Sequence, residues 1–129
     1  MDVWKELEKE LDDSASNNIP SPASKRTIAE IDESDEKIQT VGKVEDMEGG
    51  NLRIRDKTGS MRVIFDDREM IENLEPGDSV RIYGSPLTLG DSIKLHARII
   101  QNLDELNLKL FEKVRNEVKK FERELMIKN

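Results

Sequence analysis

Basic side chains recur at every second position in several short stretches between Asn51 and Ile99. Alternation of this kind is typical of half-buried β-strands, because successive side chains point to opposite faces of a sheet. The set predicted to point outward is Arg53, Arg55, Arg62, Arg81, Tyr83, Lys94, His96 and Arg98. The set predicted to point inward is Leu52, Ile54, Val63, Phe65, Val80, Ile82, Ile93, Leu95, Ala97 and Ile99. An apolar core under a basic coat predicts a surface that binds phosphate groups.

The strongest candidates for phosphate binding lie on two consecutive predicted strands and the turn between them. They are Arg53, Arg55, Lys57 and Arg62. The alternative is a solvated outer face on which these cations pair with carboxylates of neighbouring strands. The basic residues of the later strands, from Arg81 to Arg98, can instead be covered in part by the C-terminal helix.

The composition gives little support for an enzyme or for a metal site. The chain has no cysteine, and its one histidine, His96, is flanked by Leu95 and Ala97. A nucleophile, a base and an orienting group therefore cannot be assembled, and no second metal ligand accompanies the histidine. The glycines form no phosphate-cradling motif. We expect no enzyme, no metal and no cofactor.

The formal net charge of −7 is unevenly distributed along the chain. Residues 1–50 hold 6 basic and 14 acidic side chains, whereas residues 51–101 hold 8 of each. Local patches steer a polyanion at physiological salt, since the screening length is about 8 Å. Acidity therefore does not exclude nucleic acid. No apolar run approaches the roughly 20 residues of a membrane span, and the N-terminus lacks a signal-peptide core. We expect a soluble intracellular protein, in the cytoplasm or nucleoid, or in the nucleus of a eukaryote.

Five predicted strands position the basic residues. They cover residues 36–46, 51–56, 60–66, 78–84 and 92–101. Gly42 within the first strand indicates a bulge or a sharp bend, and Asp56–Gly59 has the composition of a tight turn. One or two helical turns are predicted over residues 67–74, and a loop over the SPLTLGD segment before the fifth strand. Residues 27–35 predict an edge strand or an extended lead-in.

The N-terminal region is predicted to be an appendage in two parts. Residues 1–12 have the apolar spacing of a short acidic amphipathic helix, with Trp4 and Leu7 on its apolar side. Residues 13–26 are small, polar and proline-containing, which is typical of a flexible linker. A tethered helix with a tryptophan is typical of a motif that docks in a partner's groove. The alternatives are a segment that folds back on the chain and a disordered tail.

The C-terminal region, residues 102–129, is predicted to be a long oligomerisation helix. Its apolar residues include Leu110, Phe111, Val114, Val118, Phe121 and Leu125. The steps of three and four residues from Phe111 onward are typical of a seam between helices. A helix of about 25 residues spans about 38 Å, more than a small barrel can cover, which favours a partner. The alternative is an amphipathic helix packed on its own domain.

The strand strings VGKVEDMEGGNLRIRDKTGSMRVIF and GDSVRIYGSP resemble those of nucleic-acid-binding OB-folds. The resemblance implies an all-β fold, a five-stranded Greek-key barrel over residues 27–101. Residues 36–126 are similar in layout to the small subunits of replication protein A, the single-stranded-DNA-binding complex of archaea and eukaryotes. In that family the C-terminal helix enters a three-helix bundle between subunits. The N-terminal helix and linker fall outside the resemblance.

The resemblance implies a non-catalytic subunit in DNA replication, repair or recombination. Its partners would be other OB-fold subunits and single-stranded DNA. Two departures indicate auxiliary rather than primary DNA binding. The first predicted hairpin loop, DMEGG, is acidic, and Tyr83 is the only strand aromatic expected to face outward as a stacking platform. The alternatives are a protein-binding scaffold and an OB module that binds RNA or tRNA.

Overall fold

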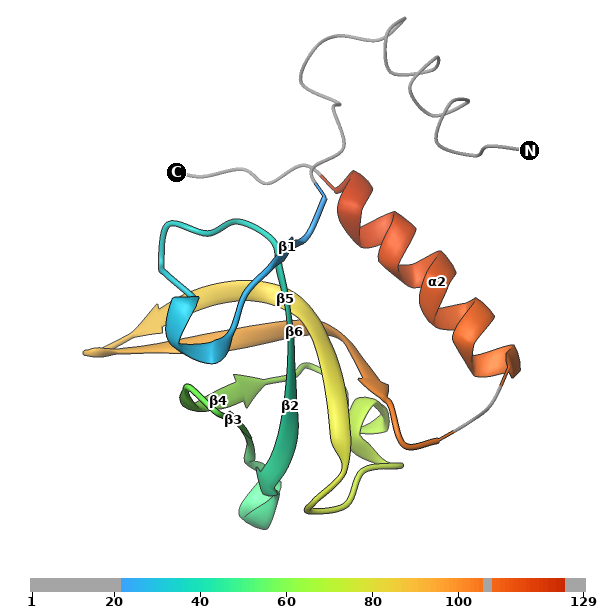
Figure 1. Cartoon of the computed structure of the whole chain (residues 1–129), viewed down its shortest axis with the longest axis horizontal. Helices are drawn as coiled ribbons and strands as arrows, with labels where there is room; N and C mark the ends of the chain where they lie inside the picture. The colour runs from blue at the N-terminus through green and yellow to red at the C-terminus, as the bar shows by residue number, and fades with distance from the viewer. Residues whose placement is uncertain (1–21, 106–107, 125–129) are drawn as a thin grey trace, which may run out of the picture.

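The computed structural model describes residues 22–105 and 108–124, which form a small barrel flanked by one helix (Figure 1). The strands are β1 (Ser24–Lys25), β2 (Ile38–Asp46), β3 (Leu52–Asp56), β4 (Gly59–Ile64), β5 (Ser79–Leu89) and β6 (Ser92–Asn102). The helical elements are η2 (Ile28–Glu30), η3 (Glu48–Gly50), η4 (Arg68–Ile71) and α2 (Leu108–Arg123). Three predicted features lie outside the described residues: the N-terminal helix with Trp4 and Leu7, linker residues 13–21, and Leu125.

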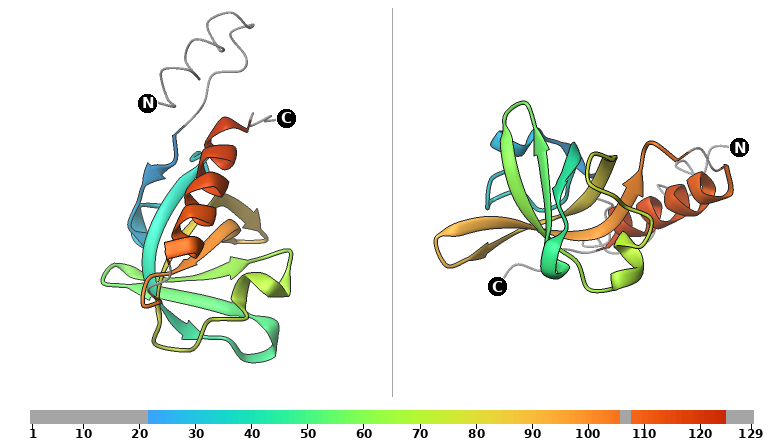
Figure 2. Two further views of the ribbon diagram at one scale, coloured as in Figure 1. Left: turned by 90° about the vertical axis from the view of Figure 1, so that its right-hand side faces the viewer. Right: turned by 90° about the horizontal axis from the view of Figure 1, so that it is seen from below.

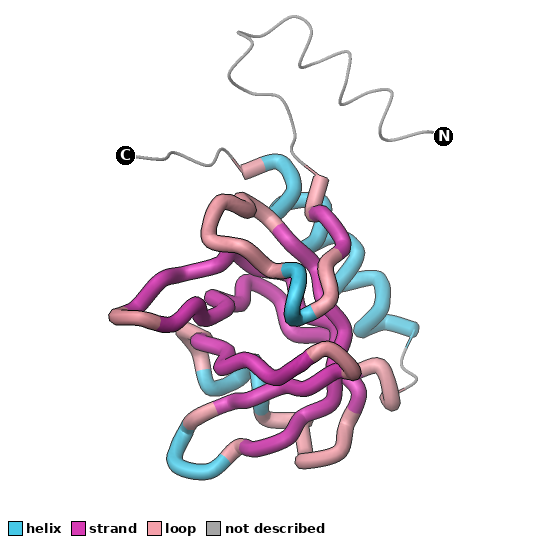
Figure 3. The backbone as a smooth tube through the Cα atoms, turned by 60° about the vertical axis from the view of Figure 1, so that its left-hand side comes forward, coloured by secondary structure: helices cyan, strands magenta, loops and turns pink. Residues whose placement is uncertain are grey.

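The predicted five-stranded barrel is confirmed. The sheet order is β1-β2-β3-β4-β6-β5, and β2 closes the barrel by pairing with β5 as well as with β3. The β4–β6 pair is parallel, and the other pairs within the barrel are antiparallel. The short β1 adds a parallel pairing to β2 outside the closed ring. In Figure 3 the strands wrap around a common centre, with loops and helical turns at the ends.

The barrel core consists of the apolar residues that alternate along each strand. Ile38, Leu52, Ile54, Val80, Ile82 and Leu95 are its largest fully buried side chains. Burial of such side chains contributes roughly 1.5–3 kcal/mol each, so the period-two pattern determines which face of every strand points inward. Ile28 and Ile31, at the start of the η2 turn and just after it, pack into the same core.

Three local predictions differ from the structure. The SPLTLGD segment is not a loop, because β5 continues to Leu89 and forms with β6 a hairpin that projects from the barrel (Figure 1). Residues 27–35 contain the η2 turn rather than an edge strand, because Thr27 and Glu30 form a capping box that closes it. The bulge of β2 lies between Val44 and Asp46 rather than at Gly42. A Cβ at Gly42 would instead meet the carbonyl oxygen of Arg55 at 2.9 Å.

Helix α2 runs back along the outer face of β5 and β6 and crosses in front of the barrel (Figure 2). Its 16 described residues span about 24 Å at 1.5 Å per residue. The described helix is therefore short enough to be covered by its own barrel. Within the described residues, no helix is both long enough and apolar enough to cross a membrane.

Candidate nucleic-acid interface

The four predicted phosphate-binding residues all lie on the exposed outer surface of β3, β4 and the turn that joins them. Arg53 stands directly opposite Arg62 in the β3–β4 ladder. Arg55 stands directly opposite Lys43 of β2, and Lys57 lies in the turn after Asp56. The strand register therefore gathers these cations, with Lys43, into one patch. We call Lys43, Arg53, Arg55, Lys57 and Arg62 the basic face.

The basic face consists of like-charged neighbours rather than ion pairs. Like charges directly opposite one another destabilise a sheet, yet both cross-strand pairs are of this kind. No carboxylate among the described residues forms an ion pair with a cation of the basic face. Asp46 faces Arg53 across the β2 bulge, but its Oδ1 accepts from the backbone N–H of Glu48. The arrangement is electrostatically suited to an external anion.

A groove of about 330 Å³ adjoins the basic face at the β4 edge. Its walls include Arg62 and Phe65, Gly50 and Asn51 of the β2–β3 connection, and Leu89 and Lys94 of the β5–β6 hairpin. Leu89 is 45% exposed, and Phe65 is half-buried: it packs against the barrel core, as its parity predicts, and also lines the groove. The groove therefore combines cations with exposed apolar and aromatic surface, the composition that single-stranded nucleic acid requires.

Phe65 and Leu89 are candidate site residues that the sequence interpretation missed. Parity assigns Phe65 to the interior, and Phe65 does pack against the core, but it follows the end of β4 at Ile64 and also lines the groove. Leu89 falls within the predicted loop, so nothing in that prediction sets it beside Arg62. The signal available in the sequence is the pair of leucines, Leu87 and Leu89, two residues apart in a segment otherwise rich in turn residues.

The prediction that Tyr83 is an exposed stacking platform is wrong. Tyr83 is only 7% exposed, because it lies beneath α2. Its ring packs edge-to-face on Phe121, with centroids 6.5 Å apart and planes at 75°. Within the described residues, the outer face of β5 thus offers no aromatic side chain to a base at this position.

Simple alternation also predicts the wrong face of the strand for Ile99, because a β-bulge interrupts β6. Tyr83 pairs with Ile99, but the next residue of β5, Gly84, pairs with Ala97. Arg98 is therefore an extra residue, and the side chains beyond it exchange faces. Ala97 belongs to the barrel core, whereas Ile99 packs under α2.

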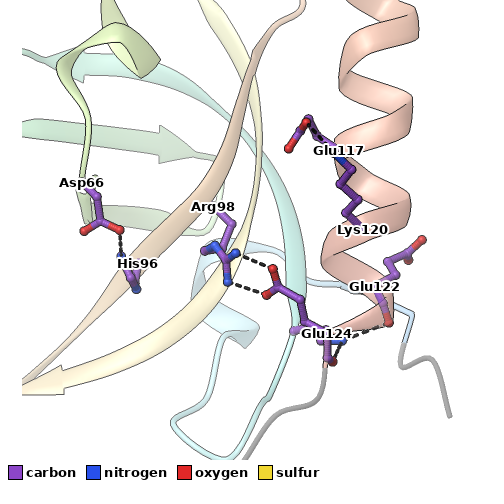
Figure 4. Close-up of polar contacts among 8 residues, drawn as sticks. Asp66, His96, Arg98, Glu117, Lys120, Glu122 and Glu124 are labelled. Carbon is purple, nitrogen blue, oxygen red and sulfur yellow. Dashed lines mark hydrogen bonds and ion pairs between the residues drawn. The ribbon is translucent and has the colours of Figure 1, made fainter. Parts of the chain in front are cut away.

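Two further outward residues of β6 are engaged by carboxylates (Figure 4). Arg98 donates two hydrogen bonds to the carboxylate of Glu124, at the end of α2. His96 Nε2 lies 3.0 Å from a carboxylate oxygen of Asp66. The pairing of Arg98 with the end of α2 matches the expectation that the C-terminal helix covers part of the later strands. His96 pairs instead with the exposed Asp66, after β4.

Part of the apolar seam predicted to contact a partner packs instead against the chain's own barrel. Phe121 is 2% exposed and packs with Ala23, Tyr83 and Ile99, and Val114 and Val118 pack against the same cluster. The expectation that the helix extends beyond what its own barrel can cover is therefore wrong for Val118 and Phe121. The unforeseen surface is the apolar outer patch that the bulge of β6 creates.

Lys37 fixes the end of α2 against the barrel. This lysine is 2% exposed, and its Nζ donates to the backbone carbonyl oxygens of Glu122 and Glu124. Burial lowers the pKa of Lys37 despite the opposing effect of the nearby Glu124 and Glu122 carboxylates. Cations near a helix C-terminus stabilise its unpaired carbonyls, so Lys37 serves as a structural cap rather than as a ligand contact.

The first half of α2 packs less closely than the second. A groove of about 540 Å³ separates it from η4 and β6 and is lined by Leu110 and Val114 of the helix. Phe111 is half-buried beside it on the helix. No group of three or more His, Asp or Glu side chains that could hold a metal ion occurs in the described part of the chain.

No protein-family model matches this chain, and no curated protein matches it. Solved structures match its fold. The second OB-fold domain of replication protein A from Methanococcus maripaludis is 14% identical, with a TM-score of 0.53 over 65% of this chain and 99% of that one. The barrel is an OB-fold.

Two other matches show how widely this OB-fold is shared. A chain of the S. pombe Stn1–Ten1 complex is 18% identical, with a TM-score of 0.51 over 80% of this chain and 97% of that one. Asparaginyl-tRNA synthetase of Entamoeba histolytica is 14% identical, with a TM-score of 0.55 over 71% of this chain and 26% of that one. Identities this low establish the fold alone.

Proposed function

We propose that this chain is a non-catalytic OB-fold subunit of a single-stranded-DNA-binding complex that acts in DNA replication, repair or recombination. The basic face would contact backbone phosphates, and the adjoining groove would receive a base against Phe65 and Leu89. The similarity to an OB-fold domain of replication protein A is consistent with this role. The proposed subunit role rests on the similarity in layout between this chain and the small subunits of replication protein A.

One observation carries the proposal: the like-charged pairs Arg53–Arg62 and Lys43–Arg55 stand exposed without a carboxylate partner among the described residues. Mutual repulsion is a cost to the isolated protein, and a polyanion lying across the pairs removes it. The usual ligand face of an OB-fold is formed by the strands that correspond to β3 and β4. The repulsive pairs thus occur on the face where a strand of DNA would lie.

Assembly is proposed to involve the first half of α2, through Leu110, Phe111 and Val114. Leu110 and Val114 line the groove between the helix and η4, and Phe111 is a half-buried residue of the same half of the helix. Val118 and Phe121 would contribute indirectly, by holding the helix on the barrel. Leu125 and the N-terminal residues Trp4 and Leu7 stay predicted partner contacts.

Oligonucleotide titration at two salt concentrations tests the DNA-binding role. Binding should weaken as salt rises, and Arg53→Gln with Arg55→Gln should lower the salt slope by about 1 for each arginine that touches a phosphate. Arg115→Gln, on the exposed side of α2, removes the same charge elsewhere and should leave the slope unchanged. Absence of binding by both the isolated chain and the complex it purifies with would contradict the proposal.

A protein-binding scaffold is the second candidate, and the groove beside α2 favours it. Under this alternative the complex forms but its nucleic-acid affinity is unaffected by changes to the basic face. The same titration with RNA of matched sequence tests an RNA- or tRNA-binding module, since the 2′-OH is the group that distinguishes the two. Tighter binding of RNA would favour that module over the DNA-binding subunit.

A further inference from the structure

A second concavity, of about 330 Å³, lies next to the basic face, with lining residues from β1, β2, β5 and the end of β3 at Asp56. Lys25 and Arg26 of the N-terminal approach line it together with Gln39 and Val41 of β2 and Arg81 of β5. Arg81 stands directly opposite Val41 in the β2–β5 ladder, and Val41 is 47% exposed. The concavity is therefore open to the solvent and contains three cations.

The two buried side-chain polar atoms that lack a hydrogen-bond partner among the described residues both belong to residues of this concavity. They are Nε of Arg81 and Oγ1 of Thr40. Buried polar atoms in proteins are almost always paired, so each exception requires an explanation. Thr40 alternates with the core residue Ile38 and pairs with Ile82, so its hydroxyl points into the barrel. Arg81 pairs with the exposed Val41 on the outer face, where an oxyanion would accept from its Nε–H.

The carboxylates of the concavity are already engaged in local hydrogen bonds. Glu30 accepts from the backbone N–H and the hydroxyl of Thr27. Asp56 accepts from Ile28, Thr58 and Gly59 across the following turn.

The cations of the concavity differ in how far they are engaged. Arg26 pairs with Asp35 at 3.4 Å. Lys25 and Arg81, by contrast, form no ion pair with a described residue.

The concavity continues the basic face rather than standing apart from it. Lys43 of that face lies opposite Ser79, two residues from Arg81 on the same side of β5. Diagonal neighbours of this kind are about 7–8 Å apart. Arg81, Lys43 and Arg55 thus follow one another across β5, β2 and β3, a path that spans two strand spacings, or about 10 Å.

We propose that Arg81 and Lys25 form a phosphate subsite for the same single strand that crosses β3 and β4, so that the bound strand continues over β2 onto β5. This subsite rests on the proposed DNA-binding function. Its phosphate would accept from Arg81 and be neutralised by Lys25, which line the same concavity. The consequence is a binding path longer than the β3–β4 face alone.

The test compares a thymidine oligonucleotide of about 5 nucleotides with one of about 15, since one OB-fold covers about 4–16 nucleotides. Arg81→Gln and Lys25→Gln should each weaken binding of the long strand several-fold and lower its salt slope by about 1. Binding of the short strand, which the basic face can hold, should stay unchanged. Arg81→Lys should retain the slope, and Arg115→Gln should change neither strand. Thermal unfolding checks that each variant is folded.

Three results would overturn the subsite. Arg53→Gln could weaken both strands while Arg81→Gln weakens neither, which would retain the proposed function and exclude this path. Arg81→Gln could weaken both strands equally, which would make Arg81 part of the primary contact. A titration with inorganic phosphate alone, followed at the amide signals of Val41 and Arg81, could saturate without any length dependence of DNA binding, which would assign the concavity to a free anion. If no strand binds at all, the function itself is wrong.

Discussion

At the residue scale, Asp56 fixes the turn between β3 and β4. Its carboxylate accepts hydrogen bonds from the backbone N–H groups of Thr58 and Gly59 and, from outside the hairpin, of Ile28. Burial acts to raise the pKa of Asp56, but these hydrogen bonds together outweigh burial and hold the pKa below its ordinary value. The side chain therefore favours the folded state in its ionised form.

Asp56→Asn is expected to lower the free energy of unfolding by about 1.5–3 kcal/mol near neutral pH, since one hydrogen bond to a charged group contributes about that much. Because the folded-state pKa lies below the unfolded one, the contribution is present above about pH 4 and is lost as the pH falls through the lowered value. Urea unfolding from about pH 7 to about pH 2 measures it. Asp91→Asn at the exposed hairpin tip is the control, and an equal loss in both variants would contradict this account.

Gly84 is the second residue on which the barrel depends, because it lies at the bulge that Arg98 creates in β6. A Cβ at this position would lie 2.2 Å from the carbonyl oxygen of His96. Gly84→Ala should therefore destabilise the fold by more than about 2 kcal/mol, the cost of forcing atoms into a packed site. Gly59→Ala is the matched control, since its nearest atom would be 3.9 Å away. Similar melting temperatures for the two variants would contradict the assigned close approach.

At the element scale, the two halves of α2 are expected to serve different purposes. Phe121→Ala should lower the free energy of unfolding by about 3–5 kcal/mol, as removal of a buried phenylalanine usually does, because Phe121 fills the contact between helix and barrel. Phe111→Asp should leave the melting temperature nearly unchanged and weaken association. Thermal unfolding and native mass measure the two effects. Dissociation of the complex by Phe121→Ala, with no change in stability, would reverse the assignment.

At the scale of the whole molecule, the net charge of the N-terminal segment is opposite in sign to that of the basic face. Residues 1–21 carry six acidic and two basic side chains. A chain beginning at residue 22 should bind oligonucleotides more tightly than the full chain at low salt, and the difference should shrink as salt screens the repulsion. Anisotropy titrations across a salt series measure this. Equal affinity of the two chains at every salt concentration would exclude a long-range role for the segment.

Local patterns in the chain were enough to predict the strands and which of their faces point inward and outward. Alternation of apolar and basic residues is local, so it predicted the strands, the core and the exposed positions of Arg53, Arg55 and Arg62. The turn at Asp56–Gly59 was also predictable, because Asp56 accepts hydrogen bonds from residues two and three positions further along the chain. These features follow from neighbours in the chain, because a strand's side chains point alternately whatever the rest of the molecule does.

Which of the outward residues stay exposed depends on contacts between distant parts of the chain. A single extra residue, Arg98, turned Ile99 outward and formed with Tyr83 the patch that Phe121 covers. The register set Arg53 opposite Arg62, and strand extension brought Leu89 beside the basic face. Bulges, register and helix docking depend on contacts between residues far apart in the chain, and a period-two pattern carries no information about them.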